Sequence, residues 1–257
     1  MTTTALIVQY LDDLLDTSSV PDYPNALNGL QLANDGPVTR IAAAVDFSLR
    51  TVTAAAEAGA NLLMVHHGMF WGGLQPIRGT SFARLQTLIR KNIAVYSSHL
   101  PLDRHALYGN NALLAAELGL EPSAEFARFK TIYIGVAGES DVATADIARR
   151  ASTFARTHSG SVRTTPIVPS RRTRRWAICT GAGASTDTLN EARERGIDTL
   201  IVGEGPHHSA VDADESGIAV IYAGHYATET LGVRAIAAHV ADRFGVQWSF
   251  IEAPTGL

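Results

Sequence analysis

The hydrophobic positions of this chain follow two periods, one typical of amphipathic helices and one typical of buried strands. Apolar side chains recur at helical spacing over residues 4–16, and a short apolar run follows at 41–45. A helix is predicted over residues 48–58, with Ser48 as its N-cap and Gly59 as its stop signal. Helix and strand periods in this order predict an α/β protein.

The same alternation continues through the rest of the chain. Further strands are predicted at residues 62–65, 93–96, 131–137, 176–179, 218–222 and 247–251. Helices are predicted between them, including one that Ser140 and Asp141 would cap and one that begins near Tyr226. Because strands and helices alternate, we expect mostly parallel or mixed sheets.

Two stretches of the chain share one design, which indicates an internal duplication. In each stretch a helix ends at a glycine, Gly59 or Gly196, an apolar strand follows, and polar groups appear at the strand's end. The next strand leads within a few residues to a histidine, His99 in one copy and His225 in the other. We therefore predict two similar α/β lobes. The first covers residues 1–125, the second covers 126–229, and residues 230–257 pack back on the first.

The stretch from Leu62 to Gly73 places two histidines at the end of a predicted strand. Four apolar residues, Leu62 to Val65, are followed directly by His66 and His67. Such a run reads as a central parallel strand, and open α/β sheets bind ligands at the carboxyl ends of such strands. Imidazole is the commonest metal ligand near neutral pH, so we interpret the pair as metal ligands rather than as surface histidines.

Further donors follow other predicted strands. Asp103 lies four residues after His99, and His225 and Glu229 lie four apart on one face of the last long helix. The candidate metal ligands are His66, His67, Asp103, His225 and Glu229. Five donors exceed what one tetrahedral ion takes, so this set predicts two adjacent ions, with Glu229 as a bridging carboxylate.

Other polar residues are candidates for different roles. His99 is interpreted as a catalytic residue that moves protons or orients a ligand, rather than as a ligand itself. Asn28 lies in an irregular polar loop, where it could bind substrate. His207 and His208 could reach the site from the second lobe or lie in a plain loop. The arginines of 171–175 read either as a solvated loop or as a patch that receives an anion.

Composition and charge narrow the function classes. Hydrophobic residues make up 46% of the chain and charged residues 18%, as in ordinary globular proteins, and no apolar run reaches about 18 residues. The amino end lacks the features of a signal peptide. Cys179 is the only cysteine, which excludes an internal disulfide, fits the cytoplasm and requires a metal site built from nitrogen and oxygen. The net charge of −4 argues against a nucleic-acid partner.

Four motifs in this order resemble the Nif-three-like dinuclear metal centre proteins, also called GTP cyclohydrolase I type 2 homologues. They are Asn28-Gly29-Leu30-Gln31, Val65-His66-His67-Gly68, His99-Leu100-Pro101-Leu102-Asp103 with Gly109-Asn110-Asn111, and Gly224-His225-Tyr226-Ala227-Thr228-Glu229. In that family the positions matching the five candidate ligands hold two metal ions. The resemblance also implies a Nif-three-like fold of two duplicated lobes, here without the inserted domain of many relatives, and a ring-shaped homohexamer.

The leading functional hypothesis is a metal-dependent hydrolase with a small-molecule substrate. Two divalent ions would activate a water and polarise the substrate, and the resemblance implies GTP or another nucleotide. The alternatives are a phosphoesterase and a non-catalytic hexameric scaffold or adaptor that binds metal. Zinc or iron is favoured, and manganese or nickel is also compatible with imidazole and carboxylate ligands.

Overall fold

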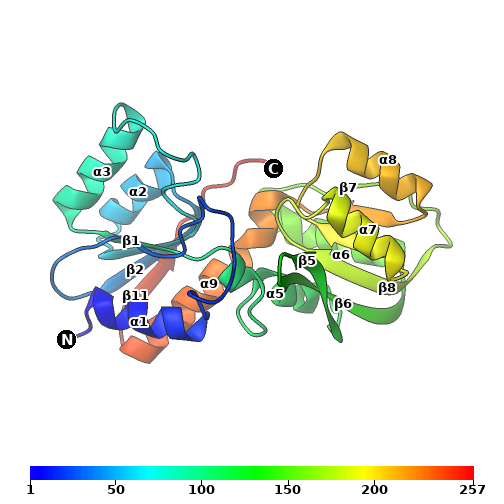
Figure 1. The fold of residues 1–257 in the computed structure, drawn as a ribbon, viewed down its shortest axis with the longest axis horizontal. Helices are drawn as coiled ribbons and strands as arrows, with labels where there is room; N and C mark the ends of the chain where they lie inside the picture. Colours follow the sequence, from blue (N-terminus) through cyan, green and yellow to red (C-terminus); the bar gives the residue numbers. More distant parts are fainter. The chain divides into compact units, whose positions relative to one another are not determined.

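The computed structural model describes residues 1–257, which form two compact units. Unit 1 comprises Met1–Leu102 and Gly232–Ala253, and unit 2 comprises Asp103–Leu231 and Pro254–Leu257. Each unit is built on one mixed β-sheet with helices packed against it (Figure 1). The predicted α/β fold class is confirmed. None of the helices has both the length and the apolar character needed to span a membrane.

The sheet of unit 1 has five strands in the order β1-β4-β3-β2-β11. Their bounds are β1 Gly29–Leu32, β2 Arg40–Asp46, β3 Leu62–His67, β4 Ala94–Ser97 and β11 Gln247–Phe250. The last four strands in that order run parallel, whereas β1 pairs antiparallel with β4. The central strands β2, β3 and β4 are buried almost throughout, as expected for parallel strands covered on both faces.

Four helices begin in unit 1: α1 Thr4–Leu14, α2 Leu49–Glu57, α3 Thr80–Lys91 and the single turn α4 Leu100–Asp103. The predicted Ser48 cap is present, because the Ser48 hydroxyl accepts from the Thr51 N–H and the Thr51 hydroxyl accepts from the Ser48 backbone N–H in a capping box. Helices α2 and α3 lie on one side of the sheet and α1 on the other (Figure 1). The core between α2, α3 and the sheet contains Val52, Leu63 and Leu88.

The sheet of unit 2 has six strands in the order β5-β6-β8-β9-β10-β7. Their bounds are β5 Ala124–Phe129, β6 Ile132–Ala143, β7 Arg163–Thr164, β8 Arg172–Cys179, β9 Thr199–Val202 and β10 Ala219–Tyr222. Strands β8, β9 and β10 are parallel, and the pairings made by β5, β6 and β7 are antiparallel. The parallel part of the sheet is therefore flanked by antiparallel strands at both edges.

Five further helices follow α4 in the chain. They are α5 Asn110–Glu117, α6 Thr144–Thr157, α7 Thr186–Glu194, α8 His207–Glu215 and α9 His225–Phe244. One core of unit 2 includes Leu189 of α7 and Ala213 of α8, and a second core includes Leu114 of α5 and Phe154 of α6. Helices from both cores sandwich the sheet (Figure 1). Helix α9 begins in unit 2 and continues in unit 1.

Both units contain the same strand–helix–strand–helix–strand run. In unit 1 the run is β2-α2-β3-α3-β4, and in unit 2 it is β8-α7-β9-α8-β10. In each, the three strands are neighbours in sequential order and the third pairs with an antiparallel edge strand, β1 or β7. The strands β2, β3 and β4 thus correspond to β8, β9 and β10.

Two local predictions are wrong. Ser140 and Asp141 do not cap α6: they lie within β6, because its pairing with β8 resumes after a bulge and continues to Ala143. The arginine segment is not a loop, since Arg172 to Arg175 form the first half of β8. In that strand the arginines are exposed while the side chain of Thr173 is buried.

The structural boundary between the units also differs from the predicted boundary. Unit 1 ends at Leu102 rather than at residue 125, because α5 packs on β6 and β8 of the second sheet. The carboxyl-terminal segment is divided as well. Residues 232–253 belong to unit 1, whereas the last four residues belong to unit 2, where the Leu257 carbonyl accepts from the Tyr226 N–H.

Candidate metal centre

Strand β3 carries His66 and His67 to the carboxyl edge of the unit 1 sheet. The strand lies between β2 and β4, and its burial continues from Leu62 through His66. His66 is fully buried and His67 is partly buried. Although successive strand side chains normally diverge, the two imidazole rings here are 4.8 Å apart at their centroids.

His99 joins these two residues from the end of the neighbouring strand β4. Its ring centroid is 4.8 Å from that of His66 and 5.7 Å from that of His67. One ring nitrogen from each of the three residues lies within 4.8 Å of the others. We call His66, His67 and His99 the three-histidine cluster. A proton-transfer role is predicted for His99 from the sequence, and its position is equally suited to ligation.

Oxygen acceptors fix the orientation of the first two rings. The Nδ1 of His66 is 3.0 Å from the Ser98 carbonyl oxygen, and the Nδ1 of His67 is 2.8 Å from Asp46 Oδ1 at the end of β2. Carbonyl and carboxylate oxygens only accept hydrogen bonds, so Nδ1 carries the proton in both rings. Metal ligation would then use Nε2, in the arrangement that metal-binding histidines commonly adopt.

Asp22 and Asn28 hold His99 in the same way. The Nδ1 of His99 is 2.9 Å from Asp22 Oδ1, and its backbone N–H donates to Asn28 Oδ1 at 2.7 Å. Burial by itself raises the pKa of Asp22, but the hydrogen bond and charge of His99, with donors from Asn28 and Leu100, hold that pKa below its usual range. Asn28 also donates to Asp22 at 2.8 Å, so both ends of its amide position His99.

Gln31 ties the loop before β1 to the loop after β3. Its Nε2 donates to the carbonyls of Ala26 and Leu27 at 3.0 and 2.9 Å, and its Oε1 accepts from the Met69 N–H at 2.6 Å. A Cβ at Gly68 would overlap the Gln31 amide group, so a larger residue there would displace Gln31 from these hydrogen bonds. The sequence flagged Gly68 as the end of the strand, and this contact supplies a second reason for it.

In unit 2 the first turn of α9 brings His225 and Glu229 together. The Nε2 of His225 is 3.1 Å from Glu229 Oε2, and its Nδ1 is 2.7 Å from Glu204 Oε1 after β9. Burial lowers the pKa of His225, but the hydrogen bonds and charges of Glu229 and Glu204 outweigh it and raise the pKa to about 10. A metal ion that binds at Nε2 would therefore displace a proton.

Gly181 allows this pair to form. It follows β8 with a φ of +61°, in the left-handed region, and a Cβ there would overlap Glu229 Oε1. Its N–H donates to the Thr228 hydroxyl at 3.1 Å, and that hydroxyl donates to the His225 carbonyl at 3.0 Å. The loop after β8 is thereby fastened to the first turn of α9.

Asp103 lies at the end of α4 and is buried. Its Oδ1 accepts from Asn110 Nδ2 at 2.8 Å, and its backbone carbonyl accepts from Asn111 Nδ2 at 3.2 Å. Asn111 also accepts from the Thr180 N–H at 2.8 Å, which links it to the end of β8. The Asn110-Asn111 pair therefore orients the Asp103 carboxylate.

The remaining histidines have other environments. His207 and His208 are exposed in the first turn of α8, so the prediction of a loop at these positions is wrong. His105 accepts from two backbone N–H groups in its own turn. His239 contacts the Tyr10 hydroxyl at 2.5 Å, and His158 ends α6.

Three carboxylates that hold histidines were not among the predicted site residues: Asp22, Asp46 and Glu204. Asp46 and Glu204 could have been found, because each stands at or just after the end of a predicted strand, in the same setting as the histidines. Asp22 lies in an irregular loop with no periodic signal, so only the folded structure reveals its contact with His99.

The donor sets of both units suit divalent cations. They consist of imidazole nitrogens whose outer N–H groups are held by oxygens, together with buried carboxylates. The one thiol takes no part: burial, followed by the charges of Asp103, Glu191 and Glu229, raises the pKa of Cys179 to about 12. The residues present therefore fit zinc, iron, manganese or nickel bound through nitrogen and oxygen.

Known proteins resemble this chain over nearly its whole length. The model of the Duf34/NIF3 (NGG1p interacting factor 3) family matches residues 2–255. A Deinococcus radiodurans protein named GTP cyclohydrolase 1 type 2 homolog is 40% identical, with 98% of this chain and 93% of that protein covered. A Halobacterium salinarum protein of the same name is 43% identical, with 94% and 96% covered. The solved structure of protein ybgI, described as of unknown function, has a TM-score of 0.87 at 32% identity and full coverage of both chains.

Proposed function

Because the chain belongs to the Duf34/NIF3 family, we propose that it is a metal-dependent hydrolase that uses two divalent ions. The proposed ligands are His66, His67, Asp103, His225 and Glu229. The observation that carries the proposal is the three-histidine cluster, in which every Nδ1 is held by an oxygen and ligation is directed to Nε2. The names of the relatives support hydrolytic chemistry.

Different residues of the chain would have different roles in such a site. Two divalent ions would supply an activated water and polarise the bond that the water attacks. Asp46 and Glu204 hold their histidines by Nδ1 and raise the basicity of Nε2. Glu229 would act as a bridging ligand, since its carboxylate has two oxygens. His99, held by Asp22, would receive or deliver a proton at Nε2. Zinc or iron is our first choice of metal, with manganese or nickel as the next.

For the substrate we propose GTP or another nucleotide, in line with the name that the relatives carry. With GTP, hydrolysis would begin by attack of water at C8 of the purine and would end with the loss of C8 as formate. A phosphoester substrate would instead release phosphate. The products therefore distinguish the two reactions directly.

The test uses the full chain loaded with each metal in turn and incubated with GTP. Formate release that is abolished in Asp103→Ala and retained in His208→Gln, a histidine exposed on α8, would support the proposal. Phosphate release alone would replace it with a phosphoesterase. With both metal positions filled, silence toward nucleotides, phosphoesters and amides would contradict a hydrolase and leave a metal-binding scaffold.

We also propose that the chain assembles as a homohexamer, which the family resemblance implies. Sedimentation equilibrium of the full chain should give a particle of six times the chain mass. A monomer or dimer at micromolar concentration would contradict this assembly.

A further inference from the structure

A hollow of about 460 Å³ lies in unit 1 beside the three-histidine cluster. It is formed by the end of β2, the glycine-rich loop that follows β3, and α3, and its volume is typical of small-molecule sites. The lining is mostly apolar and aromatic, and its main side chains are Phe47, Met69, Phe70, Trp71, Ile77 and Leu85. The exposed fraction of Ile77 is 63%, so a large apolar side chain lies open to solvent at this hollow.

Arg84 of α3 is the one charged residue in this lining. Its Nη1 donates to the Phe47 carbonyl at 3.3 Å and its Nη2 to the Ser81 hydroxyl at 3.2 Å. The guanidinium carbon lies 5.0 Å from the centroid of the Phe47 ring. Its Nε is shielded from water and has no acceptor, and no carboxylate pairs with the group. A guanidinium that contacts only neutral groups leaves one wall of the hollow positively charged.

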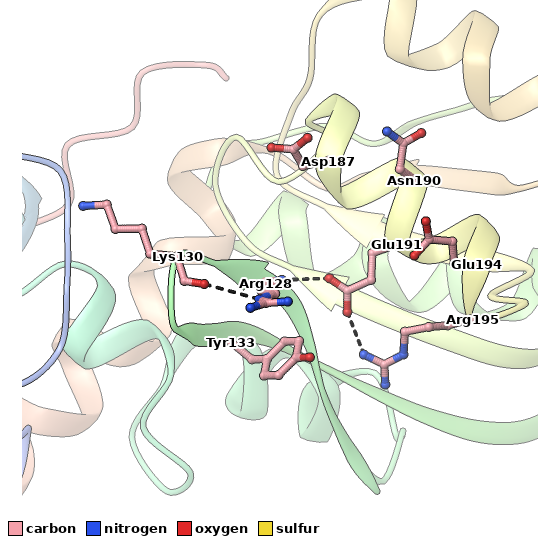
Figure 2. Close-up of a pocket in the computed structure, with 8 residues that line it drawn as sticks. All are labelled: Arg128, Lys130, Tyr133, Asp187, Asn190, Glu191, Glu194 and Arg195. Carbon is pink, nitrogen blue, oxygen red and sulfur yellow. Dashed lines mark hydrogen bonds and ion pairs between the residues drawn. The ribbon is translucent and has the colours of Figure 1, made fainter.

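The hollow at α7 in unit 2 is different, although its volume is similar, about 480 Å³ (Figure 2). There, cationic and anionic side chains line the same space. Glu191 accepts from Arg195 Nη1 at 2.7 Å and from the Arg128 backbone N–H at 2.8 Å. Arg195 thus has a carboxylate partner within the protein, and other carboxylates share this space with the cationic side chains. Arg84 has no such partner, so its charge favours an anionic ligand.

Trp71 connects the apolar hollow to the three-histidine cluster. Its ring is edge-on to His99, with centroids 4.8 Å apart at 83°, and edge-on to His67, at 5.4 Å and 81°. The same side chain lines the hollow. A ligand seated there would have Trp71 as the wall that it shares with the histidines.

We propose that this hollow, the Arg84 pocket, binds small ligands that combine a flat apolar body with a single anionic group, such as aryl carboxylates. The aromatic lining supplies surfaces for stacking, and the Arg84 guanidinium supplies one positive charge for the anion. A triphosphate would bring several negative charges to one cation, so the pocket favours a monoanion. Such binding needs no metal and goes beyond the proposed hydrolase.

The first test compares three probes by isothermal titration calorimetry on the full chain, both metal-free and metal-loaded. The probes are 2-naphthoate, its neutral analogue 2-naphthamide, and acetate. We expect naphthoate to bind at least tenfold more tightly than either of the others, with the same ranking in both metal states. Equal affinities for naphthoate and naphthamide, or no binding of naphthoate at millimolar concentration, would overturn the proposal.

The second test uses variants. Arg84→Met keeps the apolar stem and removes the charge, so naphthoate affinity should fall at least tenfold while naphthamide affinity stays the same. Trp71→Leu should weaken both aromatic probes. Arg90→Met, at an exposed arginine of the same helix, is the matched control and should change neither. An equal loss in Arg90→Met and Arg84→Met would overturn the assignment.

The two proposals fail separately. If the probes bind as expected and no hydrolysis is found, the Arg84 pocket stands and the hydrolase does not. If GTP hydrolysis occurs and naphthoate neither binds nor inhibits, the hydrolase stands and the Arg84 pocket does not.

Discussion

Strand β3 of unit 1 ends in two histidines, whereas the corresponding strand of unit 2, β9, is followed by Gly203 and Glu204. The third strand of each run leads to a histidine, His99 after β4 and His225 after β10. The strand ends of unit 1 thus carry several imidazole groups, whereas in unit 2 carboxylates surround a single imidazole. Duplicated frameworks of this kind can share their backbone plan while the residues at the strand ends take on different chemistry.

One arrangement is nevertheless common to both units. In unit 1 the Nδ1 of His67 meets Asp46 at the end of the adjacent parallel strand. In unit 2 the Nδ1 of His225 meets Glu204, which follows the strand adjacent to β10. In both cases a carboxylate from the next strand orients the ring. Both units therefore keep one orienting carboxylate for one histidine, while the other donors at the strand ends differ.

The largest effect should come from removing a buried histidine of the cluster. His66→Ala should lower the bound metal from about two ions per chain to about one, because unit 1 loses a central donor. Metal content after gel filtration, measured by inductively coupled plasma mass spectrometry, checks this. His208→Ala is the control and should retain both ions. An unchanged metal content in His66→Ala would show that His66 of unit 1 is not a metal ligand.

A smaller effect is expected at the orienting carboxylates. Asp46→Asn and Glu204→Gln should each weaken metal binding by about 10- to 100-fold, because a neutral amide replaces the charged acceptor that orients the ring and raises the basicity of Nε2. Competition with a chromophoric chelator gives the two affinities. If one variant binds metal as tightly as the unchanged protein, the arrangement in the two units is not equivalent.

Alanine substitutions at two glycines of unit 2 distinguish the stability cost of backbone strain from the cost of overlap with a site residue. Gly181→Ala should destabilise the protein by roughly 2–4 kcal/mol, because it combines left-handed strain with overlap on Glu229. Gly217→Ala has a similar φ of +70° and no neighbour within 4 Å, so it should cost only about 1 kcal/mol. Urea unfolding of both variants measures the difference. Equal costs would mean that Glu229 moves away without penalty.

The smallest expected signal is the labelling of Cys179, a probe that belongs to unit 2 alone. The thiol is buried and its pKa is raised to about 12, so iodoacetamide at pH 8 should leave the native protein unmodified and label it in urea. Mass spectrometry follows the reaction. Asp46→Asn changes unit 1 only and should leave the native labelling rate unchanged. Faster labelling in that variant would show that the two units are coupled in stability.

The positions of the buried parallel strands could be predicted from the sequence because they depend on local patterns. Apolar runs mark buried strands, and a donor at the end of such a run lies at the sheet edge, as His67 illustrates. The contacts of Asp22 and Asn28 with His99 link residues about 70 positions apart, so no local pattern reports them.

Wrong predictions arose where local signals competed with pairing to distant strands. Ser140 and Asp141 have the composition of a helix cap, but the register between β6 and β8 extends past them. The arginine-rich segment is polar enough for a loop, but Arg172 pairs with Ala143 in the same register. The boundary at Leu102 was missed for a similar reason, since the contacts of α5 with the second sheet are not visible in its own sequence.

Strand β11 pairs with β2 and is the outermost strand of its sheet, although more than 200 residues separate the two along the chain. During synthesis on the ribosome, β2 therefore emerges long before its partner exists, and one of its edges stays open until residues 247–250 are translated. The sheet of unit 1, most of which is synthesised first, is consequently the sheet that is completed last. Loss of the final segment in a truncated or prematurely released chain would leave an exposed template for aggregation.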